Sequence, residues 1–189
     1  MTAHSISTHQ PVLVTGATGN VGRGVVRELQ ELDIPFFAGG TDPARIQEAL
    51  GGAVETRAVD LRNPKTYDGA VEGMGGLFLL RPPPIGNVKE TLNVLIDRAV
   101  EAGVQHITFL SVDGADRQRW VPHHKVEQHL LGSGISYTLL RPGFFAQNLG
   151  DADHEKGFLA HNLNKKPFGR RGHHRSHRRQ VSEDRQHAK

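Results

Sequence analysis

The sequence predicts an α/β fold, a doubly wound parallel sheet of the Rossmann type with six strands. Six short apolar runs alternate with segments that carry apolar residues at helical spacing. The runs are apolar throughout rather than at every second residue, which is typical of parallel strands covered on both faces. A glycine-rich turn follows the first run, at the position where folds of this class bind a nucleotide.

The expected strands recur at regular intervals along the chain: residues 11–15, 34–38, 53–59, 76–80, 105–110 and 135–140. The expected helices lie between them, and Pro near their starts and Gly near their ends mark several boundaries. The last of these helices should span residues 120–131. Two others have clear apolar stripes, formed by Val21, Val25, Leu29 and Leu32 and by Val88, Leu92, Leu95, Ile96 and Val100.

The length and composition fit one domain with short extensions. The chain has 189 residues, of which 37% are hydrophobic, and no cysteine, so neither disulfides nor a thiolate metal site is expected. The absence of cysteine fits a cytoplasmic protein. We read no signal peptide, because the N-terminus MTAHSISTHQ is polar and has no apolar region. We read no membrane span, because no run approaches about 20 apolar residues. We expect a disordered N-terminus at 1–9, a Rossmann domain at 10–157 and a basic, disordered tail at 158–189.

The net charge of +3 is unevenly distributed. Residues 158–189 hold nine Lys/Arg and two Asp/Glu, a net charge of +7, so the rest of the chain has a net charge of −4. A mildly acidic body argues against nucleic-acid binding by the domain, whereas the tail could bind anionic surfaces weakly and without specificity. The tail motif HHRSH offers no closed set of metal ligands, so no metal site is expected.

The glycine turn predicts a dinucleotide site. Gly16 permits a tight turn, Gly19 lets the backbone approach a pyrophosphate, and Gly22 lets the following helix pack closely on the sheet. The helix N-terminus then offers free N–H groups and the positive end of its dipole. The expected contacts with the pyrophosphate side are Gly16, Thr18, Gly19, Asn20, Val21 and Gly22.

The choice between NAD and NADP stays open. Gly39-Gly40-Thr41 ends the second strand with neither the carboxylate that binds a ribose 2′-hydroxyl nor an arginine for a 2′-phosphate. Arg23 and Arg45 are the nearest cations. Asp60, followed by Leu61, could accept from the adenine amino group or could cap a helix. We expect Thr41, Asp60 and Leu61 to contact the cofactor.

Five motifs carry a family resemblance: TGATGNVGR, DLRNP at 60–64, LFLLRPPP at 77–84, FLSVDGAD at 109–116 and SGISYTLLRPGFFAQNL at 133–149. Together they resemble the NmrA-like group of atypical short-chain dehydrogenases/reductases, which includes NAD(P)H-dependent reductases. The resemblance implies a Rossmann domain followed by a smaller substrate lobe, and cofactor contacts from Leu80, Arg81, Pro142 and Gly143. The basic tail stands where that lobe is expected, which indicates a truncated or frameshifted product.

The acid–base pair of standard short-chain dehydrogenases, Tyr-xxx-Lys, is missing. Lys125 could hold the nicotinamide ribose, but Val121 occupies the tyrosine position. Ser111 could orient a substrate or cap a strand end. His123 could act as a general acid or base, but we favour the interpretation that it lies on the exposed first turn of a helix. A pair between His123 and Glu127 would then be a surface contact.

The motifs are compatible with three functions. The first is a nicotinamide-dependent oxidoreductase that transfers a hydride directly to a small quinone-like acceptor, which needs no tyrosine. The second is a non-catalytic redox sensor that binds a dinucleotide. The third is an inactive fragment without its substrate lobe.

Overall fold

The computed structural model describes residues 10–142. The predicted disorder of residues 1–9 and 158–189, the predicted end of the domain at residue 157 and the predicted contact of Gly143 lie outside the described residues. Within the described part, every helix is too short or too polar to cross a bilayer.

The six predicted strands form one parallel sheet in the order β3-β2-β1-β4-β5-β6, which confirms the predicted fold class. The strands are β1 (Val12–Thr15), β2 (Phe36–Gly40), β3 (Thr56–Ala58), β4 (Gly76–Leu80), β5 (His106–Leu110) and β6 (Ser136–Leu140). The helices are α1 (Asn20–Glu31), α2 (Pro43–Leu50), α3 (Tyr67–Val71), α4 (Leu92–Glu101) and α5 (Pro122–Gly132), and a 3-10 turn, Pro64–Thr66, precedes α3.

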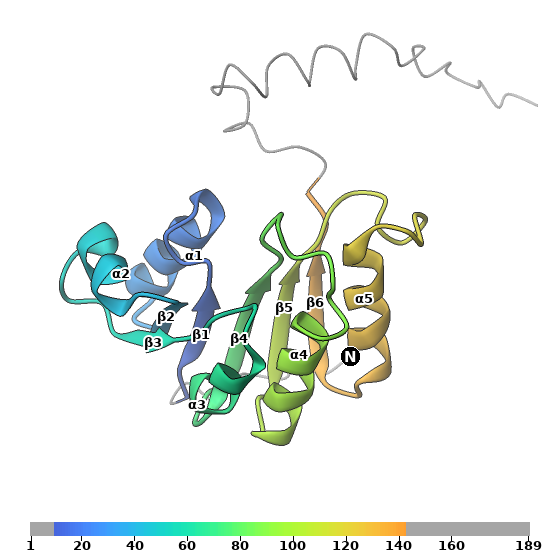
Figure 1. Cartoon of the computed structure of the whole chain (residues 1–189). Coiled ribbons are helices and arrows are strands. Elements are labelled where there is room, and N and C mark those ends of the chain that lie inside the picture. Colours follow the sequence, from blue (N-terminus) through green and yellow to red (C-terminus); the bar gives the residue numbers. More distant parts are fainter. Residues whose placement is uncertain (1–9, 143–189) are drawn as a thin grey trace, which may run out of the picture. The chain divides into compact units, whose positions relative to one another are not determined.

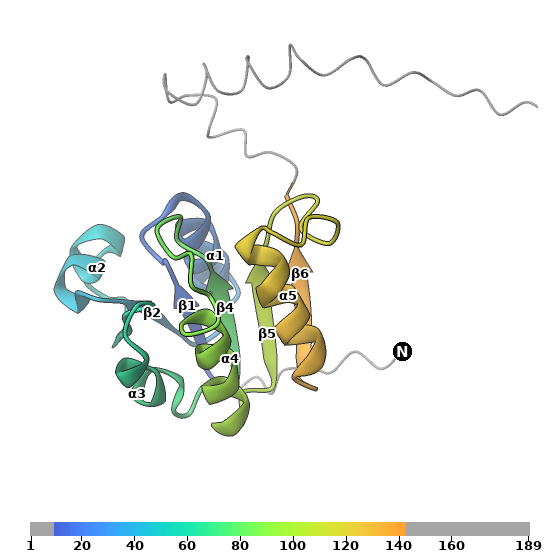
Figure 2. The same cartoon turned by 45° about the vertical axis from the view of Figure 1, so that its right-hand side comes forward.

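The strand order places a crevice at the centre of the sheet. The chain starts at β1, moves outward to β3, and then returns to β4 on the other side of β1. Helices α1 and α2 therefore cover one face, and α3, α4 and α5 cover the other (Figures 1 and 2). Because β1 and β4 are neighbours whose connections leave in opposite directions, the loops at their carboxyl ends separate and leave room for a ligand.

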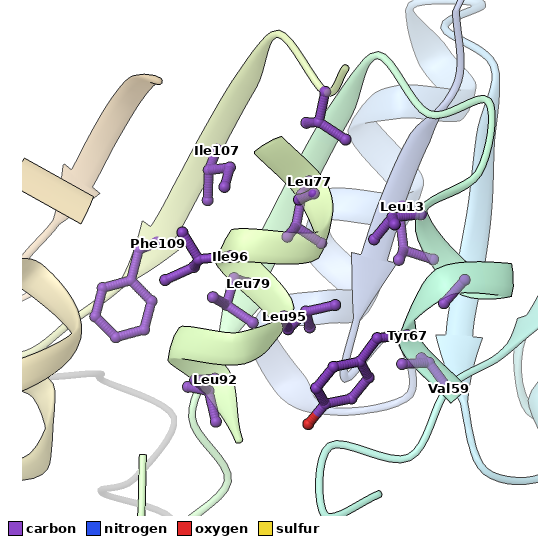
Figure 3. Close-up of a cluster of buried hydrophobic side chains, with 14 of the residues drawn as sticks. Leu13, Val59, Tyr67, Leu77, Leu79, Leu92, Leu95, Ile96, Ile107 and Phe109 are labelled. Carbon is purple, nitrogen blue, oxygen red and sulfur yellow. The ribbon is translucent and has the colours of Figure 1, made fainter. Parts of the chain in front are cut away.

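The core consists of two layers, one on each face of the sheet. The larger layer joins the sheet to α3, α4 and α5, and Figure 3 shows its side chains, among them Leu13, Leu77 and Ile96. The smaller layer joins the opposite face to α1 and α2 and includes Val14 and Phe78. Adjacent strand residues point to opposite faces, so continuous apolar strands are the expected sequence for this arrangement.

Strand β6 differs from the prediction of a sheet covered on both faces. Most of its side chains are exposed, including Tyr137 at 37% and Leu140 at 42%. The reason is its position: β6 is an edge strand, and α1 and α2 pack against β1, β2 and β3 at the other side of the sheet.

Two predicted helix stripes each include a residue that is exposed. Leu32 is 64% exposed because α1 ends at Glu31. Val100 lies within α4 but is 38% exposed, since the buried residues of that helix are Leu92, Asn93, Leu95, Ile96 and Ala99. The second strand begins at Phe36 rather than at residue 34, since Pro35 has no N–H to donate to a neighbouring strand.

Candidate functional site

The glycine turn connects β1 to α1 at the crevice. Gly16 has a φ of +64°, which favours glycine, and its carbonyl accepts the N–H of Gly19 at 3.0 Å. The hydroxyl of Thr15 donates to the carbonyl of Phe78 at 3.0 Å and accepts the N–H of Leu80 at 3.2 Å. Thr15, which belongs to none of the predicted site residues, therefore fastens the end of β1 to the end of β4.

Helix α1 packs directly on this turn. A Cβ on Gly22 would overlap the carbonyl oxygen of Gly16 and would lie 2.8 Å from the Cα of Ala17. Only glycine fits at this position, which agrees with the role predicted for Gly22.

The N-terminus of α1 has no side-chain cap. Its N-cap residue is Gly19, no side chain accepts a hydrogen bond there, and the first turn contains no acidic residue. The first N–H groups of a helix have no partners inside the helix and normally receive one from a capping side chain. Here these groups, together with the helix dipole, are available for an anion.

Two cavities lie beside the glycine turn. The first, of about 690 Å³, adjoins the ends of β2 and β3. The second, of about 350 Å³, adjoins the ends of β4 and β5. The first is lined by Gly16, Thr18, Arg23, Thr41, Arg45, Asp60, Leu61 and Arg62 among others, and the second by Gly19, Asn20, Val21, Gly22, Leu80, Arg81, Pro83, Leu110, Ser111, Val112 and His123.

Local hydrogen bonds occupy both acidic side chains of the first cavity. Asp42 caps α2 by accepting the N–H of Arg45 at 3.2 Å. Asp60 accepts the N–H of Arg62 at 2.9 Å, and Asn63 rather than Asp60 caps the 3-10 turn. The proposed helix cap at Asp60 is therefore wrong in detail, although the residue does stabilise the local turn and does line the cavity.

His123 is buried, which contradicts the expectation of an exposed first turn. Its side chain is 9% exposed and its ring lies against the ring of Phe109, with 6.0 Å between the centroids. Arg81 donates from Nε to His123 Nε2 at 3.3 Å. Burial, reinforced by the charge of Arg81, lowers the pKa of His123 to about 4, so the ring is neutral at physiological pH.

Glu127 is also fully buried, so the predicted surface pair with His123 is wrong. Its carboxylate accepts the hydroxyl of Ser111 at 2.5 Å and two hydrogen bonds from Arg141 at 2.9 and 2.8 Å. Burial by itself would raise the pKa of Glu127, but these hydrogen bonds more than offset it, so the pKa lies below its usual value. This network joins α5 to the ends of β5 and β6.

The remaining residues predicted for the site differ in whether they lie near the two cavities. The side chain of Lys125 is exposed and lines neither cavity. Pro142 lies near the second cavity, because its carbonyl accepts the N–H of Asp113 at 3.3 Å, just after Ser111 and Val112. Of the two tyrosines, Tyr67 is buried, and its hydroxyl donates a hydrogen bond to the carbonyl of Leu61. Burial and the charge of Asp60 raise the pKa of Tyr67 to about 12. Tyr137 lines neither cavity.

Comparison with known proteins decides the family. The sequence model of the NAD(P)H-binding family matches residues 16–171. The chain belongs to this family. Membership confirms the nicotinamide dinucleotide as the cofactor class, and the fold agrees with it.

Relatives of this NAD(P)H-binding protein include reductases. It is 37% identical to an NAD(P)H azoreductase of Xenophilus azovorans over 77% of this chain and 53% of that one. It is 35% identical to the prestalk A differentiation protein A of Dictyostelium discoideum over 86% and 52%. The NADPH complex of the Escherichia coli quinone oxidoreductase superposes with a TM-score of 0.65 at 28% identity, over 80% and 54%. The chain thus spans about half the length of these relatives.

Substituting Gly22 with alanine should destabilise the turn on which the site depends. We expect Gly22→Ala to cost about 2 kcal/mol in the free energy of unfolding, because the backbone of Gly16 and Ala17 has to move. Gly24→Ala is the matched control, since no atom beyond its chain neighbours and the backbone of its own helix would lie within 4 Å of the new Cβ, and it should gain up to about 1 kcal/mol from helix propensity. Urea unfolding of both variants measures the difference, and equal stabilities would contradict the packing described.

Removing Arg141 should leave the carboxylate of Glu127 buried without its partner. We expect Arg141→Met to lower the free energy of unfolding by about 2 to 3 kcal/mol at pH 7. The loss should shrink toward pH 5, because the desolvated carboxyl then binds a proton more readily in the folded state than in the unfolded state. Arg98→Met, which breaks exposed ion pairs only, should cost less than about 1 kcal/mol. A loss at Arg141 that does not depend on pH would argue against this role of Glu127.

Acidification should destabilise the fold through His123. The unfolded state binds a proton near the ordinary pKa of 6.5 and the folded state only near 4, so stability falls as pH falls through this interval. Between pH 7 and pH 4.5, the wild type should lose about 2 kcal/mol more than His123→Leu. Urea titrations at the two pH values measure this difference, and parallel losses in both proteins would show that His123 titrates normally.

Proposed function

We propose that this protein transfers a hydride from NADPH directly to a small quinone-like acceptor. The observation that carries the proposal is the uncapped N-terminus of α1 between two cavities of unequal size. The kind of acceptor is suggested by the azoreductase and the quinone oxidoreductase among the relatives. Carbonyl–alcohol chemistry is disfavoured, because neither described tyrosine can serve as the acid.

The residues present fit a dinucleotide. The N–H groups of the first turn of α1 would bind the pyrophosphate, and glycine at 19 and 22 keeps the approach free of side chains. The first cavity, with Thr41, Asp60 and Leu61, would hold the adenosine, and the second, with Leu80 and Arg81, would hold the nicotinamide. Reduced nicotinamide supplies the hydride, so the chain has to position two reactants and exclude water.

The exposed arginines of the first cavity support NADPH rather than NADH as the cofactor. Three arginines line it: Arg23, Arg45 and Arg62. Arg23 donates to the carbonyls of Thr18 and Ala49, whereas Arg45 and Arg62 are exposed and form no ion pair within 4.0 Å in residues 10–142. A 2′-phosphate adds negative charge that these guanidinium groups could bind.

Cofactor titration tests the proposal. By nicotinamide fluorescence, NADPH should bind at least about tenfold more tightly than NADH, which corresponds to about 1.4 kcal/mol. Arg45→Ala should reduce this preference severalfold without weakening NADH binding, because only the 2′-phosphate contact is lost. Arg27→Ala, on the exposed side of α1 beside Glu28 and Glu31, is the control and should leave both affinities unchanged.

Turnover separates the proposed activity from its alternatives. Stopped-flow oxidation of bound NADPH by a soluble benzoquinone should be rapid compared with the reaction in free solution. Tight binding without any acceleration would contradict the proposed reductase and favour the dinucleotide sensor. Failure to bind either cofactor would favour an inactive fragment.

A further inference from the structure

The second cavity contains a buried imidazole whose tautomer is determined by a neighbour. His123 lies on the first turn of α5 and lines this cavity together with Ser111 and Arg81. Arg81 Nε donates to His123 Nε2 at 3.3 Å. A guanidinium can only donate, so Nε2 must be the accepting nitrogen, and the single proton of the neutral ring lies on Nδ1.

Arg81 is itself held in place. Its Nη1 donates to the carbonyls of Pro82, Pro83 and Ile85 at 3.3, 3.0 and 2.8 Å. The guanidinium therefore cannot turn away from His123 without losing three hydrogen bonds to the loop after β4. No carboxylate lies within 4.0 Å of Arg81 in the described part of the chain, whereas the charge of Glu127 acts on the His123 ring in the opposite sense to that of Arg81.

The Nδ1–H group of His123 belongs to a ring that lines the second cavity. No hydrogen bond from Nδ1 to another described residue is present. Across residues 10–142, Asn93 Oδ1 is the sole side-chain polar atom that is both fully buried and unpartnered. His123 Nδ1 is not such an atom, and because His123 lines the second cavity, its ring lies beside any ligand bound there.

We propose that His123 is a catalytic residue that donates its Nδ1 hydrogen bond to the acceptor oxygen on which negative charge develops during reduction. The inference rests on the proposed function and deepens it by naming the residue that stabilises the reduced acceptor, for quinones and other acceptors on whose oxygen negative charge develops. The quinone gains a hydride from the reduced cofactor and one proton from water, and the hydroquinone leaves with both electrons.

Ser111 and Glu127, which are hydrogen-bonded to each other, cannot donate to the acceptor. The hydroxyl of Ser111 already donates to Glu127, so toward the cavity it can only accept. The carboxylate of Glu127 accepts from Ser111 and Arg141 and is fully buried. A neutral imidazole beside a fixed cation is a strong hydrogen-bond donor that keeps its proton, as an oxyanion-stabilising group requires.

The test compares two acceptors in the full 189-residue chain. One is a soluble benzoquinone, whose oxygen gains charge. The other is a triarylmethyl cation, which takes a hydride at carbon and develops no oxyanion. His123→Leu removes the donor, and His123→Asn keeps an N–H near the position of Nδ1. Gln128→Ala, on the exposed side of α5, is the control, and NADPH affinity is measured for every variant.

His123→Leu should slow single-turnover reduction of the quinone about 100-fold, the loss typical of one oxyanion donor. Its reduction of the triarylmethyl cation and its affinity for NADPH should stay within twofold of the wild type. His123→Asn should recover at least tenfold of the lost quinone rate. The wild-type quinone rate should also be constant from pH 6 to pH 8, because the ring donates a hydrogen bond and not its proton.

Three results would overturn the inference. A quinone rate within threefold of the wild type in His123→Leu, or an equal loss with both acceptors, would show that His123 contributes no specific donor. If His123→Leu fails to fold, His123→Gln replaces it as the variant without a donor at the Nδ1 position, and His123→Asn remains the variant that keeps one. If the wild type reduces both acceptors and His123→Leu reduces the quinone equally fast, this inference alone is overturned. If the wild type binds NADPH but reduces neither acceptor, the proposed function is overturned as well.

Discussion

The packing of α1 on the turn after β1 is the constraint on which the site depends. Because the backbone of Gly16 lies where a Cβ of residue 22 would be, α1 begins directly above the end of the central strand. The same geometry places glycine at the N-cap, so the helix begins without a side-chain partner for its first N–H groups. An anion that binds there accepts hydrogen bonds from these N–H groups, and one cavity lies on each side of it.

Beside this turn, Ser111 and His123 line the second cavity, and neighbouring side chains determine where their protons lie. Ser111 donates inward to Glu127, Arg141 clamps the same carboxylate, and Arg81 holds His123 in one tautomer. No described group that lines this cavity is set up to exchange a proton near neutral pH, since burial and Arg81 lower the pKa of His123 to about 4. Such a site suits chemistry that the cofactor carries, with the protein supplying position and hydrogen bonds.

The sequence predicts the sheet and the glycine turn because both follow from local rules. Continuous apolar runs and glycine spacing are visible without knowing what lies nearby in space. The burial of Glu127 and His123 escapes prediction because it depends on α5 packing over β5, and a polar stretch such as PHHKVEQ has a weak helical stripe. Arg141, the partner of Glu127, lies 14 residues further along the chain, directly after β6, and Thr15 binds Phe78 across 63 residues. Such pairings depend on the tertiary structure, so no local sequence pattern predicts them.

The most direct test of the cofactor site is to observe the first turn of α1 as the cofactor binds. In amide NMR spectra of the full chain, adding NADPH should shift the N–H signals of Asn20, Val21 and Gly22 strongly, because a pyrophosphate would accept their hydrogen bonds. Signals from the far end of α1, near Glu31, should change little. Saturating NADPH that leaves the three amides unshifted would contradict the assignment of this turn as the cofactor site.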